Sequence, residues 1–148
     1  MEKYFISFEN LTSHQLYDLL KLRQDVFVIE QQCIYEDFDG YDKQAIHFLI
    51  YKGSEIAAYS RIFAPKIKYK NDSSIGRIIV AQQFRGGELG KVLIKESVDY
   101  CLTHFPENII RIEAQAELTG YYSKLGFISD SDIYDVDGIS HLQMIYED

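Results

Sequence analysis

The sequence contains no tryptophan and only two prolines and two cysteines among its 148 residues. Apolar residues make up 47% of the chain, so the composition gives no indication of disorder. The cysteines, Cys33 and Cys101, show no CxxC spacing and give no sign of a disulfide framework. Two isolated thiols fit a reducing compartment.

Long apolar runs are missing as well. No run approaches the roughly 20 residues that a membrane span needs. The first ten residues, MEKYFISFEN, do not combine a basic region with an apolar run, as a signal peptide does. We therefore expect a cytoplasmic protein without a membrane partner.

Positive charge is scarce, because 15 lysines and arginines face 23 aspartates and glutamates and give a formal net charge of −8. A nucleic-acid-binding protein needs a basic face, so we expect no nucleic-acid partner. An anionic cofactor would have to be bound locally, by backbone N–H groups and a few cations. The length suits one domain over residues 1–148.

Apolar periodicity predicts the element order β-α-β-β-β-α-β-α-β-β. Alternation indicates a first strand in residues 3–9, and helical spacing indicates a helix over residues 11–30, with Thr12 and Gln15 as a capping box. The later elements are predicted as a hairpin over 45–64, a strand over 74–81, a helix over 88–105, a strand over 108–117, a short helix over 118–126 and a hairpin over 127–147. This mixture of hairpins and crossovers indicates an α+β (mixed α/β) domain.

The segment FRGGELGKVLIKE, residues 84–96, passes from a strand through glycines into a helix, an arrangement that often binds phosphate. It does not fit a Walker A loop, because Gly86 and Gly90 enclose three residues instead of four and Val92 follows Lys91. It also lacks the G-x-G-x-x-G spacing of a dinucleotide-binding loop.

Two motifs together resemble those of the GCN5-related N-acetyltransferase (GNAT) superfamily. RGGELGK is similar to its acetyl-CoA loop, with Arg85 and Gly90 at the matching ends, and YYSKLGF, residues 121–127, is similar to the segment that carries its general acid. Glu88 departs from the pattern, because it stands where the loop usually has its first glycine. Further segments resemble the ElaA-like branch of the superfamily: LRQDVFVIEQQCIYEDFDGYD, AYSRI, GRIIV, AQAEL and DGISHLQM.

The resemblance implies a three-layer fold, in which a mostly antiparallel sheet with a splayed parallel pair carries helices on both faces. It implies acetyl-CoA as co-substrate. The ligand sets around Asp37 and His47 are incomplete, so we expect no metal. The pyrophosphate would be bound, with help from Arg85, by the N–H groups of Gly86, Gly87, Leu89, Gly90 and Lys91. The pantetheine arm would pair with the backbone of Ile78, Ile79 and Val80.

The resemblance also implies a catalytic acid at Tyr122, four residues before Gly126, with Tyr121 as its rival. A phenol there would protonate the leaving thiolate. We expect acetyl transfer to a primary amine of a small molecule or peptide by direct attack in a ternary complex. The base that deprotonates this amine is left open among Glu30, Glu113, His141 and water.

The acidic segment YEDFDGYD, residues 35–42, permits several interpretations. A calcium loop would need a later glutamate, but the twelfth position from Asp37 is Phe48. The other two interpretations are a solvated turn and a rim that attracts the amine substrate. Arg23 and Arg61, unusual inside apolar runs, could pair with these acids or bind a substrate carboxylate.

Two other functions are considered. Acyl-homoserine-lactone synthases share the superfamily fold, and the segment RQDVF resembles them. Their acyl-carrier-protein donors would need a basic docking patch. These synthases also usually have a tryptophan in this first segment, which this chain lacks. Lys66, Lys68 and Lys70 form only a small patch. The second is a non-enzymatic CoA-binding or interaction module. The oligomeric state is left open, and a homodimer is one of the states considered.

Overall fold

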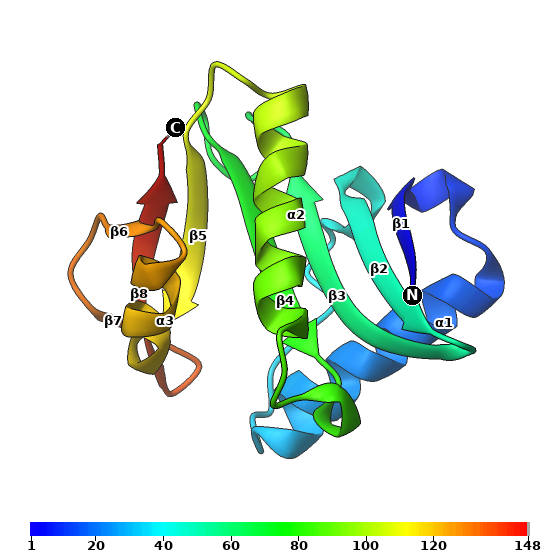
Figure 1. Cartoon of the computed structure of the whole chain (residues 1–148). Coiled ribbons are helices and arrows are strands. Elements are labelled where there is room, and N and C mark those ends of the chain that lie inside the picture. Colours follow the sequence, from blue (N-terminus) through cyan, green and yellow to red (C-terminus); the bar gives the residue numbers. More distant parts are fainter. Residues whose placement is uncertain (148) are drawn as a thin grey trace.

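The computed structural model describes residues 1–147 (Figure 1). Its strands are β1 (Glu2–Ser7), β2 (Ile46–Lys52), β3 (Glu55–Phe63), β4 (Ser73–Val80), β5 (Ile110–Gln115), β6 (Ile128–Ser129), β7 (Tyr134–Val136) and β8 (Ile139–Tyr146). Its main helices are α1 (Ser13–Arg23), the π-helix η2 (Gln24–Glu30), α2 (Leu89–His104) and α3 (Thr119–Lys124). The predicted element order is confirmed from the first strand to α3, but three strands follow α3 instead of the predicted two.

The strands form one eight-stranded sheet in the order β1-β2-β3-β4-β5-β8-β6, with β7 paired to β8. All pairs are antiparallel except β4 and β5, which are parallel. Helix α2 crosses the near face of the sheet in Figure 1, with α3 beside it, while α1 lies behind the strands. The predicted mixed fold with helices on both faces is confirmed.

Strand β2 explains why both faces are covered. Phe48 and Ile50 belong to the apolar cluster under α2, whereas Leu49 and Tyr51 belong to the cluster under α1. Successive side chains of a strand point to opposite faces, so a continuous apolar run indicates a strand that is buried on both. The run therefore places β2 in the middle layer of three.

The first helix begins as predicted. The Thr12 hydroxyl accepts from the Gln15 N–H at 3.1 Å, and the Gln15 side chain accepts from the Thr12 N–H at 2.9 Å, which completes the capping box. The prediction of one regular helix to residue 30 is wrong, because the turns widen into a π-helix at Gln24. Such segments are rare and often occur at functional sites, and this one carries Phe27 to the cavity described below.

Strands β4 and β5 pair at only two positions, Ser73 with Ile110 and Ser74 with Arg111. Beyond them the two strands part, because β4 stays with β3 and β5 stays with β8. Strand β4 also has a bulge, where Arg77 adopts a φ of 48°. The sheet is therefore open at its centre, between β4 and β5 (Figure 1).

The C-terminal prediction is only partly right. Strands β7 and β8 form the expected hairpin, which turns at Asp137 and Gly138. The residues before it form a separate short strand, β6, in which Ile128 pairs with Ile145. The polar residues 130–132 interrupt the strand pattern here, so the segment does not continue straight into β7. Within residues 1–147, no helix has the length and apolar character needed to cross a membrane.

Candidate active site

A cavity of about 450 Å³ lies at the opening between β4 and β5. Ile78 of β4 and Tyr122 of α3 line it together, beside side chains from β3, β8 and the segment that follows α1. The charged and titratable side chains on its walls include Arg61, Lys68, Arg77, Glu113 and His141. Apolar walls with a few polar groups are typical of small-molecule sites.

The glycine loop stands beside this opening, between the end of β4 and the start of α2. Gly86 adopts a φ of 92°, in the left-handed region that favours glycine. Helix α2 begins at Leu89, so its first N–H groups have no acceptor within the helix. The side chain of Glu88 is 78% exposed and lies 3.5 Å from the Lys91 ammonium, so its carboxylate points outward.

Arg85 is held by Val80 at the end of β4 and by Glu30 at the end of η2. Its Nη1 and Nη2 atoms donate to the two carboxylate oxygens of Glu30 at 2.7 and 3.0 Å, and its Nε donates to the Val80 carbonyl at 2.9 Å. Glu30 is therefore bound to Arg85 at the end of η2 and is not among the residues that line the cavity. This placement separates Glu30 from the other candidate bases.

The backbone of β4 has one side bound to β3 and one side directed to the opening. The Ala81 N–H donates to the Ala57 carbonyl at 2.8 Å, and Ile79 lies opposite Tyr59. Hydrogen-bonding directions alternate along a strand, so the N–H and carbonyl of Val80 point away from β3. The bond from Arg85 to the Val80 carbonyl agrees with this direction.

The two tyrosines of α3 point in different directions. Tyr122 is only 7% exposed, packs edge-on against Phe127 and lines the cavity. Burial raises the pKa of Tyr122 above its ordinary value, so the phenol is protonated at neutral pH. Tyr121 is 37% exposed, and its hydroxyl lies against Gly90, where an added Cβ would stand 2.8 Å from it.

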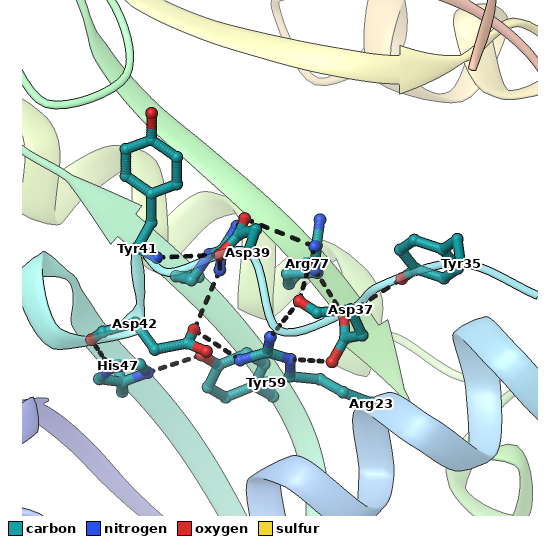
Figure 2. Close-up of polar contacts among 10 residues, drawn as sticks. Arg23, Tyr35, Asp37, Asp39, Tyr41, Asp42, His47, Tyr59 and Arg77 are labelled. Atoms are coloured by element: carbon teal, nitrogen blue, oxygen red, sulfur yellow. Dashed lines mark hydrogen bonds and ion pairs between the residues drawn. The ribbon is translucent and has the colours of Figure 1, made fainter. Parts of the chain in front are cut away.

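Three arginines and three aspartates form an ion-pair network beside the cavity (Figure 2): Arg23, Arg61, Arg77, Asp37, Asp39 and Asp42. Arg23 is fully buried and lies 2.9 Å from Asp37 and 2.7 Å from Asp42. Arg61 lies 2.7 Å from Asp39 and 3.0 Å from Asp42. The interpretation of Arg23 and Arg61 as partners of the acidic segment is confirmed.

The arginines of the network keep Asp39 and Asp42 charged. Burial alone would raise the pKa of Asp39, but the hydrogen bonds from Arg61 and from the Tyr41 N–H hold that pKa well below its usual range. Burial opposes ionisation of Asp42 too, and hydrogen bonds from Arg23 and Arg61 lower its pKa. The negative charges of the three carboxylates are thus compensated by arginines of the same protein. The interpretation of these carboxylates as a free rim that attracts an amine is wrong.

His47 holds this network from below (Figure 2). It is fully buried, and its Nδ1 and Nε2 atoms lie 2.6 Å from the Tyr59 hydroxyl and 2.8 Å from the Asp42 carbonyl oxygen. Burial lowers the pKa of His47. A neutral imidazole that accepts from Tyr59 and donates to the carbonyl satisfies both contacts. His47 is therefore a structural core histidine.

The other candidate bases lie on the far wall of the cavity. Glu113 of β5 lines it and accepts a hydrogen bond from the Tyr134 hydroxyl at 2.7 Å. His141 of β8 lines it too, with Nδ1 2.8 Å from the Ile139 carbonyl oxygen. Across the part of the chain that the structure describes, no group of three or more His, Cys, Asp or Glu is placed to hold a metal ion.

Sequence reasoning missed two cavity residues, Arg77 and Lys68. Arg77 gives a usable signal, because it is the only charged residue within the apolar strand IGRIIV. Lys68 gives none, since it stands among other lysines in a polar connection and only the fold directs it to the cavity.

Known proteins resemble this chain in sequence and in fold. Residues 15–147 match the family model described as an acetyltransferase (GNAT) domain. Over 142 residues the chain is 39% identical to protein ElaA of Escherichia coli K12. The aligned region covers 93% of this chain and 90% of ElaA. The chain therefore belongs to the GNAT acetyltransferase family. Within that family its likeness is to the ElaA branch.

Solved structures support the same grouping. The crystal structure of Escherichia coli ElaA matches with a TM-score of 0.92 and 37% identity, over 99% of this chain and 100% of ElaA. A Pseudomonas aeruginosa protein described as an acyl-CoA N-acyltransferase also matches with a TM-score of 0.92, at 28% identity over 99% of this chain and 100% of its own. The open sheet with one parallel pair is thus a shared arrangement.

Proposed function

We propose that this protein is an acyl-CoA-dependent N-acyltransferase that transfers the acetyl group of acetyl-CoA to a primary amine by direct attack in a ternary complex. The observation that carries the proposal is the position of Tyr122, which lines the cavity at the opening between β4 and β5. The cavity provides room for the amine beside the proposed path of the thioester, and Tyr122 provides a proton donor on its wall.

The glycine loop is the proposed binding site for the pyrophosphate. The N–H groups of Gly86, Gly87, Leu89, Gly90 and Lys91 stand at the N-terminus of α2, where the helix dipole favours negative charge. Lys91 adds a nearby cation, and the carboxylate of Glu88 points away. For Arg85 to help, it would have to exchange its contact with Glu30 for the phosphate.

The backbone of Ile78, Ile79 and Val80 is the proposed track for the pantetheine arm. The N–H of Val80 points toward the opening, so an extended ligand can pair with it as an added strand would, while the Val80 carbonyl already accepts from Arg85. An N–H group of β4 at this position can also donate to the thioester oxygen as negative charge develops there. Such donors are worth most in a site that excludes water.

The chemistry then follows from the groups on the cavity walls. The amine nitrogen attacks the thioester carbonyl carbon, the C–N bond forms and the C–S bond breaks. Tyr122 donates its phenolic proton to the sulfur, and the nitrogen loses a proton to Glu113, His141 or water. The phenol is later reprotonated from solvent. Because its raised pKa keeps Tyr122 protonated, the donor is present throughout the neutral range.

Cys33 and Cys101 are both free thiols, which fits the reducing cytoplasm as the proposed location.

Two measurements on the purified protein test the proposal. Calorimetry should detect binding of CoA and acetyl-CoA, and a thiol-release assay with a panel of primary amines should detect turnover above hydrolysis. Absence of CoA binding would refute the proposal outright. Binding without turnover of any amine would instead support a non-enzymatic CoA-binding module.

A further inference from the structure

The acceptor cavity has two chemically different walls. One is formed by β3, β4 and the connection between them, and it carries Arg61, Arg77 and Lys68. The other is formed by β5, β8 and the turn between β7 and β8, and it carries Glu113, Asp137 and His141. A ligand in this cavity therefore meets cations on one side and two acids with a histidine on the other.

Arg77 is rigidly held but retains hydrogen-bonding capacity. Its Nε donates to the Asp37 carboxylate at 2.8 Å, and its Nη2 donates to the Asp37 carbonyl at 3.1 Å. The rings of Phe27 and Tyr35 lie 5.9 and 5.8 Å from its guanidinium carbon. Within residues 1–147, Nη1 is the one nitrogen of this guanidinium without a partner, and the side chain is 22% exposed. Arg77 can thus donate to a ligand without rearrangement.

Lys68 is an exposed cation at the cavity. Its ammonium lies 4.4 Å from the Tyr41 ring centroid and 6.0 Å from that of Phe63. In the described part of the chain, no carboxylate forms an ion pair with it. Partial burial lowers the pKa of Lys68, the charges of Asp39 and Glu113 raise it, and those of Arg61 and Arg77 lower it. A bound carboxylate would supply the ion-pair partner that Lys68 lacks.

The opposite wall suits the amine. Glu113 pairs with Gln143 and Gln115 pairs with His141 across β5 and β8, so these four side chains share one face of the sheet. All four line the cavity. An ammonium group is attracted by Glu113, and either Glu113 or His141 can accept its proton.

Resting on the proposed acetyl transfer, we propose that the acceptor is an amine that also carries a carboxylate, as an amino acid does. Lys68 and Arg77 bind the carboxylate, and the amine faces Glu113 and His141. A linear polyamine fits this cavity poorly, because a second ammonium would lie against Lys68 and Arg77. A cavity of about 450 Å³ suits a molecule of amino-acid size.

Matched acceptors provide the test. The probes are the standard amino acids, their C-terminal amides and spermidine, each assayed with acetyl-CoA by thiol release. At least one amino acid should exceed its own amide by about tenfold or more in kcat/KM, because a charge-assisted contact is lost in the amide. Lys68→Met should raise KM for that amino acid and bring the acid-to-amide ratio toward one. Lys70→Met, a nearby exposed lysine outside the cavity, is the control and should change neither.

Product binding separates this inference from the acetyl transfer itself. Calorimetry on the CoA complex compares N-acetyl amino acids with their amides, and it requires no turnover. The carboxylate site is supported if an N-acetyl amino acid binds, its amide does not bind, and Lys68→Met abolishes the binding of the acid. This conclusion holds even if every amine fails to react and the proposed transfer is refuted. Equal or better turnover of amides or spermidine overturns the inference, as does a lack of any preference for the acids in both assays.

Discussion

The hydroxyl of Tyr121 occupies the space that a side chain at Gly90 would need, with an added Cβ 2.8 Å from the hydroxyl oxygen. This contact joins the first turn of α2 to α3, and Val80 of β4 lies 3.7 Å from the same point. Gly90 therefore lets three elements meet beside the proposed pyrophosphate site. Its role combines close packing with access to the backbone.

Gly90→Ala is predicted to weaken CoA binding by about tenfold or more while the protein stays folded. Tyr121 is partly exposed and can swing away from the new methyl group, and alanine favours helix by up to about 1 kcal/mol over glycine. The displaced ring and the methyl group would instead obstruct the ligand. Calorimetry with CoA and a thermal melt measure both effects.

The matched control is Gly120→Ala in α3, where an added Cβ meets nothing within 4 Å. It should leave CoA affinity unchanged. Undiminished affinity in Gly90→Ala would show that the pyrophosphate binds elsewhere.

Tyr122→Phe is predicted to lower kcat by about 10²–10⁴ and to leave KM for acetyl-CoA nearly unchanged. The phenylalanine keeps the edge-on packing against Phe127, so folding should survive. Tyr121→Phe should cost much less, because the Tyr121 hydroxyl lies at Gly90 and the Tyr122 side chain lines the cavity. Steady-state kinetics of both variants decide the matter. If Tyr121→Phe lowered kcat strongly and Tyr122→Phe left kcat normal, the catalytic acid would be Tyr121.

Arg23→Met is predicted to reduce the free energy of unfolding by about 3–5 kcal/mol, because Asp37 and Asp42 each lose their fully buried arginine partner and keep only Arg77 and Arg61, respectively. Urea denaturation measures the change. Lys21→Met, which removes an exposed ion pair with Asp25, is the control and should shift the midpoint little. A loss in Arg23→Met no larger than in the control would mean that the network contributes little to stability.

Stability is predicted to fall with acidification in two steps. Burial lowers the pKa of His47 in the folded state, so its contribution is complete above the unfolded pKa of about 6.5 and is lost as pH falls through the folded pKa. Asp39 and Asp42 also have lowered folded pKa values, so their contribution is complete above about pH 4 and is lost below it.

Urea midpoints measured from pH 8 to pH 3 test this dependence. His47→Gln should remove the first step and keep the second. His14→Gln, which changes an exposed histidine at the start of α1, should keep both. A first step that persists in His47→Gln would assign it to another group.

The sequence by itself determined the features that depend on neighbours along the chain. The Thr12 capping box involves positions three residues apart, and the continuous apolar run of β2 involves successive residues. The glycines before α2 follow the same logic. Backbone geometry and local hydrogen bonds act over a few residues, so their signals remain readable in one dimension.

Only the tertiary structure decided which polar groups meet. Arg23 and Asp37 are 14 residues apart in sequence, and Arg77 and Asp37 are 40 apart. Because these residues pair, the acidic segment is part of an internal ion-pair network and is not a free rim that attracts the substrate. The placement of Lys68 opposite Glu113 likewise depends on how β4 and β5 part. Charges interact through space and according to burial, and a linear pattern records neither.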